Sequence, residues 1–155
     1  MKKTMTILAA MAAAGAANGA LIISQYYEGA SNDKYIEVFN SGSGSIDFTS
    51  TSFTLALYSN AIRENWKTSG STTSTVLLDT GILNSGDTLL FKHSSAANPS
   101  YAATLGTASS ITNFNGDDSI AIFSGDSTNA ADLVDVLGFT SNVGGNTSFT
   151  RNSIN

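Results

Sequence analysis

Residues Leu21–Asn40, LIISQYYEGASNDKYIEVFN, decide the fold of this chain. Leu21–Tyr27 and Lys34–Asn40 are rich in β-branched and aromatic residues, and the polar stretch Glu28–Asp33 separates them. Two such runs joined by turn-forming residues are typical of a β-hairpin. Alternation along the second run places Glu37 between two aromatic residues on one face, with aliphatic residues on the other.

The same period-2 pattern recurs along the rest of the chain. Turn-forming sequences, among them Asn84–Asp87 and the dipeptide Asn115-Gly116, separate the apolar runs. We predict further strands at Ile46–Phe48, Phe53–Tyr58, Thr75–Asp79, Asp87–His93, Ser119–Phe123, Leu133–Leu137 and Ser148–Arg151.

Seven to nine short strands with no long helical pattern predict an all-β fold. The expected architecture is an antiparallel β-sandwich of immunoglobulin-like type. A small β-barrel is the alternative, because periodicity does not separate the two. The segment Asn60–Lys67 has two interpretations: one helical turn, because Ile62 and Trp66 lie four residues apart, or an edge strand.

The N-terminus has the pattern of a secretory signal peptide. Two lysines precede the uncharged apolar run Met5–Ala17, and small residues follow it. That run is shorter than the roughly 20 apolar residues that span a bilayer, which argues against a transmembrane helix. We therefore predict a signal peptide at residues 1–19, cleaved after Gly19 or Ala20, and a single secreted or surface-exposed domain at 20–155.

The composition excludes several classes of function. Two of the 7 basic residues leave with the signal peptide, so 5 basic residues face 12 acidic ones, for a formal charge of about −7. That charge disfavours nucleic acids and anionic lipids as partners. The chain has no cysteine, which excludes disulfides, thiolate metal sites and cysteine nucleophiles.

Several short pieces of sequence occur in an order and spacing that are specific to one family. They are Leu21–Ser24, Tyr27–Gly29, Tyr35–Asn40, Asn115–Ala121 and Val134–Gly138, with Phe149–Arg151 near the end. Together they resemble the lamin tail domain of secreted bacterial proteins. The resemblance implies an immunoglobulin-like sandwich, often found beside a separate secreted nuclease or phosphatase domain.

That family has no established catalytic residues, so the resemblance implies none here. Gln25 stands where the family's opening strand commonly has an acidic residue, so no carboxylate role is carried to that position. Relatives commonly continue beyond Arg151, which suggests that this sequence is a fragment of a longer protein.

Four acidic residues are candidates for a site. Glu37 either contacts a ligand or accepts hydrogen bonds from backbone N–H groups of a neighbouring loop. Asp117, Asp118 and Asp135 supply oxygens of the kind that Ca²⁺ prefers. The alternative is turn chemistry, in which the Asp side chains cap local N–H groups. No Asp-x-Asp-x-Asp-Gly loop is present.

Catalysis has weak support in the sequence. His93 is the one histidine, and neighbouring serines suggest a Ser-His-acid triad on paper. However, adjacent residues on a strand point to opposite faces, and the chain has no Gly-x-Ser-x-Gly motif. We interpret His93 as a surface residue at a strand end, and we expect no enzyme activity, no metal and no cofactor.

Aromatic residues are the remaining candidates for a binding surface. Exposed aromatic rings on a β-sandwich can stack on sugars, although most aromatics in such a domain are core residues. The candidates are Tyr26, Tyr27, Tyr58, Trp66 and Tyr101, with Trp66 foremost because its segment is polar.

The function that these observations favour is a secreted, non-catalytic binding module. It would serve adhesion, surface attachment or substrate targeting, through an extracellular ligand such as a glycan, a protein or a surface polymer. The alternative is an accessory N-terminal domain of a longer secreted nuclease or phosphatase. Reading the gene beyond Asn155 separates the two, because a downstream domain rich in His, Asp and Asn favours the alternative.

Overall fold

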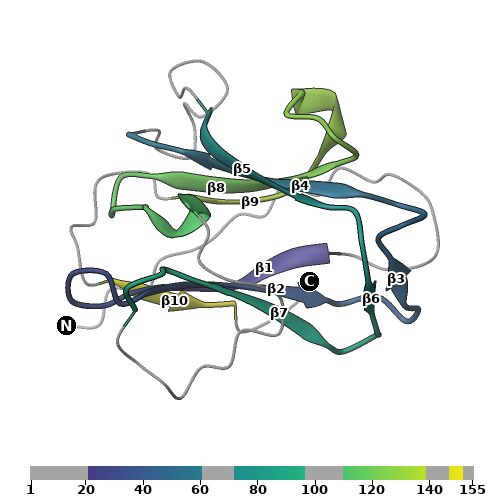
Figure 1. Ribbon diagram of the computed structural model, residues 1–155, viewed down its shortest axis with the longest axis horizontal. Coiled ribbons are helices and arrows are strands. Elements are labelled where there is room, and N and C mark those ends of the chain that lie inside the picture. Colours follow the sequence, from purple (N-terminus) through teal and green to yellow (C-terminus); the bar gives the residue numbers. More distant parts are fainter. Residues whose placement is uncertain (1–20, 61–71, 97–109, 139–146, 152–155) are drawn as a thin grey trace.

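The structure, a computed structural model, describes residues 21–60, 72–96, 110–138 and 147–151. Two four-stranded antiparallel sheets pack face to face (Figure 1). The first sheet has the order β10-β1-β2-β7, with β10 at Ser148–Thr150, β1 at Leu21–Glu28, β2 at Lys34–Asn40 and β7 at Thr88–Lys92. The second has the order β5-β4-β8-β9, with β5 at Thr72–Leu78, β4 at Phe53–Tyr58, β8 at Ser119–Ser124 and β9 at Leu133–Gly138.

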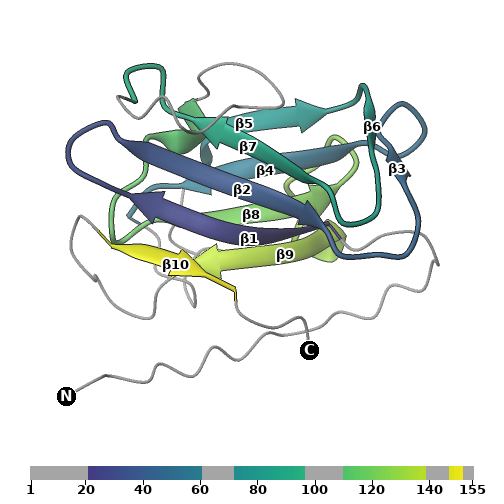
Figure 2. The ribbon, with the colours of Figure 1, turned by 90° about the horizontal axis from the view of Figure 1, so that it is seen from below.

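Smaller elements close the sandwich. The two-residue strands β3 (Ile46–Asp47) and β6 (Ile82–Leu83) pair with each other at one end, on the right of Figure 2. The 3₁₀ helix η1 (Ser110–Thr112) lies between the two sheets, and η2 (Ala130–Asp132) joins β8 to β9. None of the helices in the described ranges is long and apolar enough to cross a membrane.

The predicted sandwich is confirmed. The hairpin of Leu21–Asn40 forms as expected, and each predicted strand is present within a few residues of its predicted bounds. The barrel alternative is wrong, because among the described residues the two large sheets are not joined by strand pairing. Strand β6 was not predicted. Of the ambiguous segment Asn60–Lys67, only Asn60 is among the described residues.

One core fills the space between the sheets. Alternate residues of the facing strands point inward, as the period-2 pattern requires. Aromatic rings occupy both ends of this core: Phe48 and Phe53 meet edge to face at 6.1 Å, and Tyr26 and Phe114 lie 4.2 Å apart. Every described buried side-chain nitrogen or oxygen has a hydrogen-bond partner. Burying this apolar surface is the main favourable term for folding.

A β-bulge in β1 changes which side chains reach the core. Ile23 pairs with Val38 and Gln25 pairs with Glu37, so Ser24 is an extra residue. Strict alternation after Ile23 would turn Gln25 inward, whereas the bulge moves the inward position by one residue. Tyr26 therefore points into the core and is fully buried.

The outer face of the second sheet is also buried along its two central strands. Ala56, Tyr58, Ala121 and Phe123 form a second apolar cluster there, with partly buried residues of β9 packed against it. Strands β4 and β8 are therefore buried on both faces, unlike a strand with one face open to solvent.

Candidate functional site

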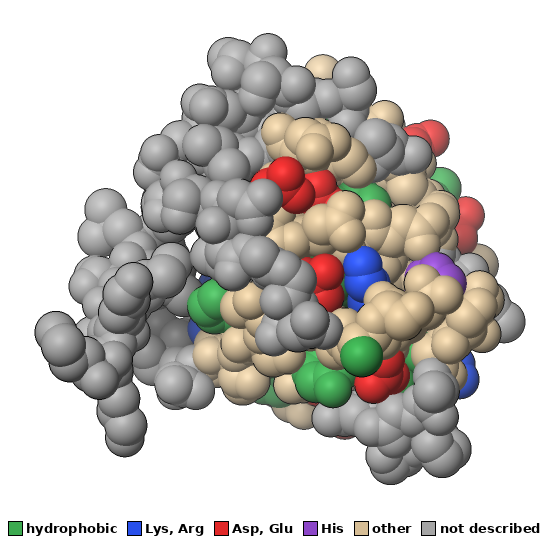
Figure 3. Space-filling view, turned by 90° about the vertical axis from the view of Figure 1, so that its left-hand side faces the viewer, with side chains coloured by type: hydrophobic (Ala, Val, Ile, Leu, Met, Phe, Trp, Pro, Cys, Tyr) green, Lys and Arg blue, Asp and Glu red, His purple; other side chains and the backbone are tan. Residues whose placement is uncertain are grey.

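The two ends of the sandwich differ in the side chains that they hold. We call the left end in Figure 1 the hairpin end; it contains the β1–β2 turn and the loop between η1 and β8. Figure 3 looks onto this end, where acidic and basic side chains lie next to each other. We call the opposite end the β3–β6 end.

At the hairpin end, the bulge in β1 brings two polar groups inward. The Tyr26 hydroxyl donates a hydrogen bond to Glu28 Oε2 at 2.8 Å, and it lies 3.2 Å from the backbone oxygen of Asn115. Glu28 is only 4% exposed. Burial and the neighbouring Glu28 carboxylate raise the pKa of Tyr26, so its hydroxyl stays protonated and acts as a donor.

Lys34 reaches across from the start of β2 to the same group. Its Nζ lies 3.5 Å from Glu28 Oε1, and both side chains are largely buried. Nζ also donates a short hydrogen bond to the backbone oxygen of Phe114, and it lies 3.5 Å from Asn115 Oδ1. The ammonium sits 5.7 Å from the centre of the Phe114 ring, which adds a cation–π contact.

Asp118 fixes the loop that carries Asn115. Its Oδ2 accepts the backbone N–H of Asn115 at 2.6 Å, and its Oδ1 accepts that of Asn60 at 2.6 Å. The side chain is 2% exposed. Burial raises the pKa of Asp118, and the two N–H donors only partly offset that effect.

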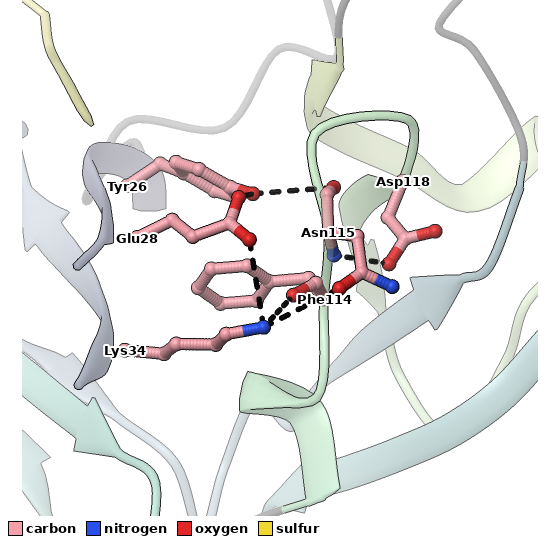
Figure 4. Close-up of polar contacts among 6 residues, drawn as sticks. All are labelled: Tyr26, Glu28, Lys34, Phe114, Asn115 and Asp118. Atoms are coloured by element: carbon pink, nitrogen blue, oxygen red, sulfur yellow. Dashed lines mark hydrogen bonds and ion pairs between the residues drawn. The ribbon is translucent and has the colours of Figure 1, made fainter. Parts of the chain in front are cut away.

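Figure 4 shows how these groups converge from three separate segments. An amine, a carboxylate and a side-chain amide meet around Lys34 Nζ beside an aromatic ring. The hairpin turn that holds Glu28 next to Lys34 depends on Gly29, because a Cβ there would lie 2.9 Å from the Tyr27 ring. Chemically, the arrangement can hold a buried ion pair or transfer a proton between the amine and the carboxylate.

A second polar cluster joins the sheets along their β1–β9 edge. Asp135 Oδ2 accepts the backbone N–H of Ile23 at 2.8 Å, next to the bulge. Both Asp135 oxygens also accept from Arg151, at 3.1 and 3.0 Å. The register of β8 and β9 shifts beside Asp135, so a second bulge aims its carboxylate at β1.

The structure places the predicted ligand residue Glu37 on the outer face of the first sheet. Its Oε1 accepts a hydrogen bond from the Ser24 hydroxyl at 2.6 Å. The donor is thus the bulged serine of the neighbouring strand, whereas the structural alternative expected backbone N–H groups of a loop. Ligand contact by Glu37 stays a prediction.

The three proposed calcium ligands do not meet. Asp118 and Asp135 each bind backbone N–H groups in different parts of the sandwich, and Asp135 pairs with Arg151 as well. Among the residues that the structure describes, no group of three or more His, Asp or Glu side chains is placed to hold a metal ion. The geometry gives the calcium hypothesis no support, and a melting temperature measured with millimolar Ca²⁺ and with chelator tests it.

His93 follows β7 and makes a local contact. Its ring Nδ1 accepts the backbone N–H of Ser95 at 3.1 Å, and the His93 backbone N–H donates to the Lys34 backbone oxygen at 3.0 Å. These contacts fit the interpretation of His93 as a strand-end residue.

The prediction of an exposed aromatic surface is wrong for two of its five residues. Tyr26 is fully buried and Tyr58 is 5% exposed, so neither can stack on a sugar from solution. The bulge at Ser24 turns Tyr26 into the core, and the apolar cluster on the outer face of the second sheet covers Tyr58. Tyr27 is half-buried against Tyr35, with ring centres 5.4 Å apart. Trp66 and Tyr101 lie outside the described residues.

The β3–β6 end is built differently. Its described loops carry Asp47, Asp79, Asp87 and Asp126, and no Lys, Arg or His lies in residues 41–52, 79–87 or 124–132. Asp47 is fully exposed, and hydrogen bonds from Thr49 lower its pKa. Ile82 is 66% exposed beside an open hollow of about 440 Å³, whose walls are Phe48, Gly81, Ile82, Leu83, Asp87, Thr88 and Leu89.

Sequence reasoning missed the hairpin-end cluster because it assumed regular alternation in β1. A signal was present: after Ile23, alternation would bury Gln25 and Tyr27 and expose Tyr26. A polar serine and glutamine between apolar inward residues indicate a bulge at that point. The inward position of Glu28 then follows.

Comparison with known proteins adds one finding. The family model of the lamin tail domain matches residues 14–141. The chain matches no curated protein and no solved structure closely enough to support an argument.

Proposed function

Because this chain belongs to the lamin tail domain family, we propose that it is a secreted, non-catalytic β-sandwich module that acts by binding an extracellular partner. One observation carries the proposal. The buried acidic side chains at the hairpin end are held by contacts within the fold, whereas the loops of the β3–β6 end present exposed carboxylates and an exposed Ile82.

The same observation supports the non-catalytic role. A carboxylate that performs acid–base chemistry on a partner molecule must be reached by that molecule from solution. Glu28 and Asp118 are 4% and 2% exposed; Glu28 accepts a hydrogen bond from Tyr26, and Asp118 accepts one from Asn60. These acids therefore stabilise the sandwich, and recognition is left to the exposed loops.

We place the binding surface at the β3–β6 end. A solvent-exposed isoleucine beside a hollow that Phe48, Leu83 and Leu89 help to line supplies contact area, and small polar loops around it supply hydrogen bonds. The partner is an extracellular glycan, protein or surface polymer.

The test is a binding screen of the mature chain against glycan, protein and cell-wall arrays. Ile82→Ser should abolish the signal, because it removes the exposed apolar contact without disturbing the core. Val134→Ser is the matched control, since Val134 is 38% exposed on β9 and should bind as the wild type does. Equal binding by both variants would show that the binding surface lies away from Ile82. Saturable turnover of ester, phosphate or DNA substrates would contradict the non-catalytic role.

Secretion is tested separately. Expression of the full chain in a bacterial host should release a product that begins at Ala20 or Leu21, because cleavage is expected after Gly19 or Ala20. Full-length protein retained in the cells would contradict the signal peptide.

A further inference from the structure

The cluster around Lys34 Nζ contains a side-chain amide in addition to the two partners of the ion pair. A primary amine lies 3.5 Å from a carboxylate oxygen and 3.5 Å from the oxygen of a side-chain amide. Both charged partners are largely buried, and Figure 4 shows Nζ pointing at the two groups. An amine, an amide and a proton acceptor are the components of an amide-exchange reaction.

We propose that Lys34 and Asn115 become joined by an amide bond between their side chains, with Glu28 as the catalytic residue that moves the protons. The inference is independent of the proposed binding function. It assigns a covalent cross-link to a chain that has no cysteine.

The reaction balances without an oxidant or a cofactor. Glu28 takes a proton from the Lys34 ammonium, and the neutral amine attacks Cγ of Asn115. The Nζ–Cγ bond forms, Nζ loses a second proton, and the Cγ–Nδ2 bond breaks. The departing nitrogen collects the protons through Glu28, so the products are a secondary amide and one molecule of ammonia, released as ammonium.

The fold holds both reactants in place. The Asn115 backbone is fixed at both sides, since its N–H donates to Asp118 and its carbonyl faces the Tyr26 hydroxyl. Reacting atoms held roughly 3–3.5 Å apart gain a large rate advantage over free groups in solution. Nζ lies 3.5 Å from Oδ1 of the Asn115 amide, the oxygen bonded to the carbon that the amine would attack.

The contacts of Glu28 also place a proton acceptor beside the amine. Tyr26 donates to Glu28 Oε2 and leaves Oε1 facing Nζ. Glu28 Oε1 is therefore the acceptor placed to take a proton from the Lys34 ammonium. The nucleophile is thereby produced at the position where it reacts.

The bond would tie distant parts of the sandwich together. Lys34 begins β2 in the first sheet, and Asn115 lies in the loop that leads to β8 in the second. The two residues are 81 positions apart in sequence. A cross-link of this span restricts the unfolded chain as a disulfide would.

Intact mass spectrometry of the folded full chain, followed by peptide mapping, tests the proposal. The expected mass is lower than the sequence mass by one ammonia molecule. Trypsin should fail to cleave after Lys34, and the peptide that contains Lys34 should be found joined to the peptide that contains Asn115.

Matched variants isolate the three reacting groups. Lys34→Arg, Asn115→Ala and Glu28→Gln should each show the full sequence mass, whereas the controls Lys92→Met and Asn113→Ala should keep the ammonia loss. Lys34→Arg preserves the positive charge and Asn115→Ala preserves the Lys34–Glu28 pair, so circular dichroism can verify that these variants fold.

Two results would overturn the proposal. One is a wild-type protein that folds and keeps its full sequence mass. The other is an ammonia loss that persists in Lys34→Arg, because ring closure of Asn115 onto the following Gly116 also expels ammonia and needs no lysine.

Discussion

The hairpin end and the β3–β6 end of the sandwich both carry several carboxylates, yet they use them in opposite ways. At the hairpin end, Glu28 and Asp118 are almost fully buried. Glu28 accepts from the Tyr26 hydroxyl and pairs with Lys34, and Asp118 accepts the backbone N–H of Asn60, 58 positions away. At the β3–β6 end, Asp47 and Asp87 are exposed, and their carboxylates accept hydrogen bonds from Thr49 and Asn84 of their own loops.

The difference separates acids that hold the fold from acids that are available to a partner. Burying a carboxylate lowers stability unless hydrogen-bond donors contact it. Removing either the carboxylate or its donor therefore leaves a buried polar group without a partner. An exposed carboxylate remains hydrated, and its substitution changes stability little. Variants at the two ends should therefore differ in kind: loss of stability at one, loss of binding at the other.

The largest effect is expected for Lys34→Met. It removes the ammonium beside Glu28, and breaking a buried ion pair typically costs about 3–5 kcal/mol. The proposed bond to Asn115 takes the place of that ion pair in the cross-linked protein, and losing the bond would cost about 4 kcal/mol for a loop of that length. Urea unfolding of Lys34→Met, Asn115→Ala and the wild type separates the two contributions, because Asn115→Ala lacks the bond but keeps the Lys34–Glu28 pair, whereas Lys34→Met lacks both. A Lys34→Met protein as stable as the wild type would contradict the role of the hairpin end.

Asp118→Ala should come next. It leaves the backbone N–H groups of Asn60 and Asn115 without their acceptor, which we expect to cost about 2–4 kcal/mol. Its neighbour Asp117 is the control, since Asp117→Ala should stay within about 0.5 kcal/mol of the wild type. Equal losses in the two variants would show that the turn as a whole, rather than the Asp118 carboxylate, matters.

A smaller loss is expected for Asp135→Ala at the β1–β9 edge. The substitution frees the Ile23 N–H and removes the ion pair with Arg151, and a partly buried group left without its partner costs about 1–3 kcal/mol. Arg151→Met should lose less, because Asp135 keeps the Ile23 contact. Hydrogen exchange at Ile23 measures the local effect, and unchanged protection in Asp135→Ala would contradict it.

The architecture could be predicted from the sequence because alternation depends on local composition. The hairpin of Leu21–Asn40 and the strand at Phe53–Tyr58 follow from apolar residues at every second position. Strand β6, with two residues, is too short to produce a periodic signal. Its pairing with β3 depends on contacts across the fold.

The site could be predicted only in part, for a different reason. Asp118 and Asp135 were selected as oxygen donors, but the sequence does not show which N–H groups they meet. The bulge at Ser24 reverses the facing of Tyr26 and Glu28, and that reversal creates the hairpin-end cluster. An irregularity of one residue is therefore enough to defeat a prediction based on period 2.

The pH dependence of stability should distinguish the buried acid from its exposed neighbours. Burial raises the pKa of Asp118 above its unfolded value, so the folded state binds the proton more tightly. Its contribution to stability is fully present below the unfolded pKa and is lost as pH rises through the folded pKa. The free energy of unfolding of the wild type minus that of Asp118→Asn should thus fall as pH rises from about 4 upward. A difference that grows with pH would contradict the assignment.

The smallest change in stability, and the largest in binding, should come from Ile82→Ser at the β3–β6 end. Ile82 is 66% exposed, so its side chain contributes little to the core, and the free energy of unfolding should change by no more than about 0.5 kcal/mol. Leu83, its neighbour in β6, is 3% exposed, and Leu83→Ser should cost several times as much. If Ile82→Ser proves as destabilising as Leu83→Ser, the exposed residues of the β3–β6 end also stabilise the fold. The contrast between the two ends would then be wrong.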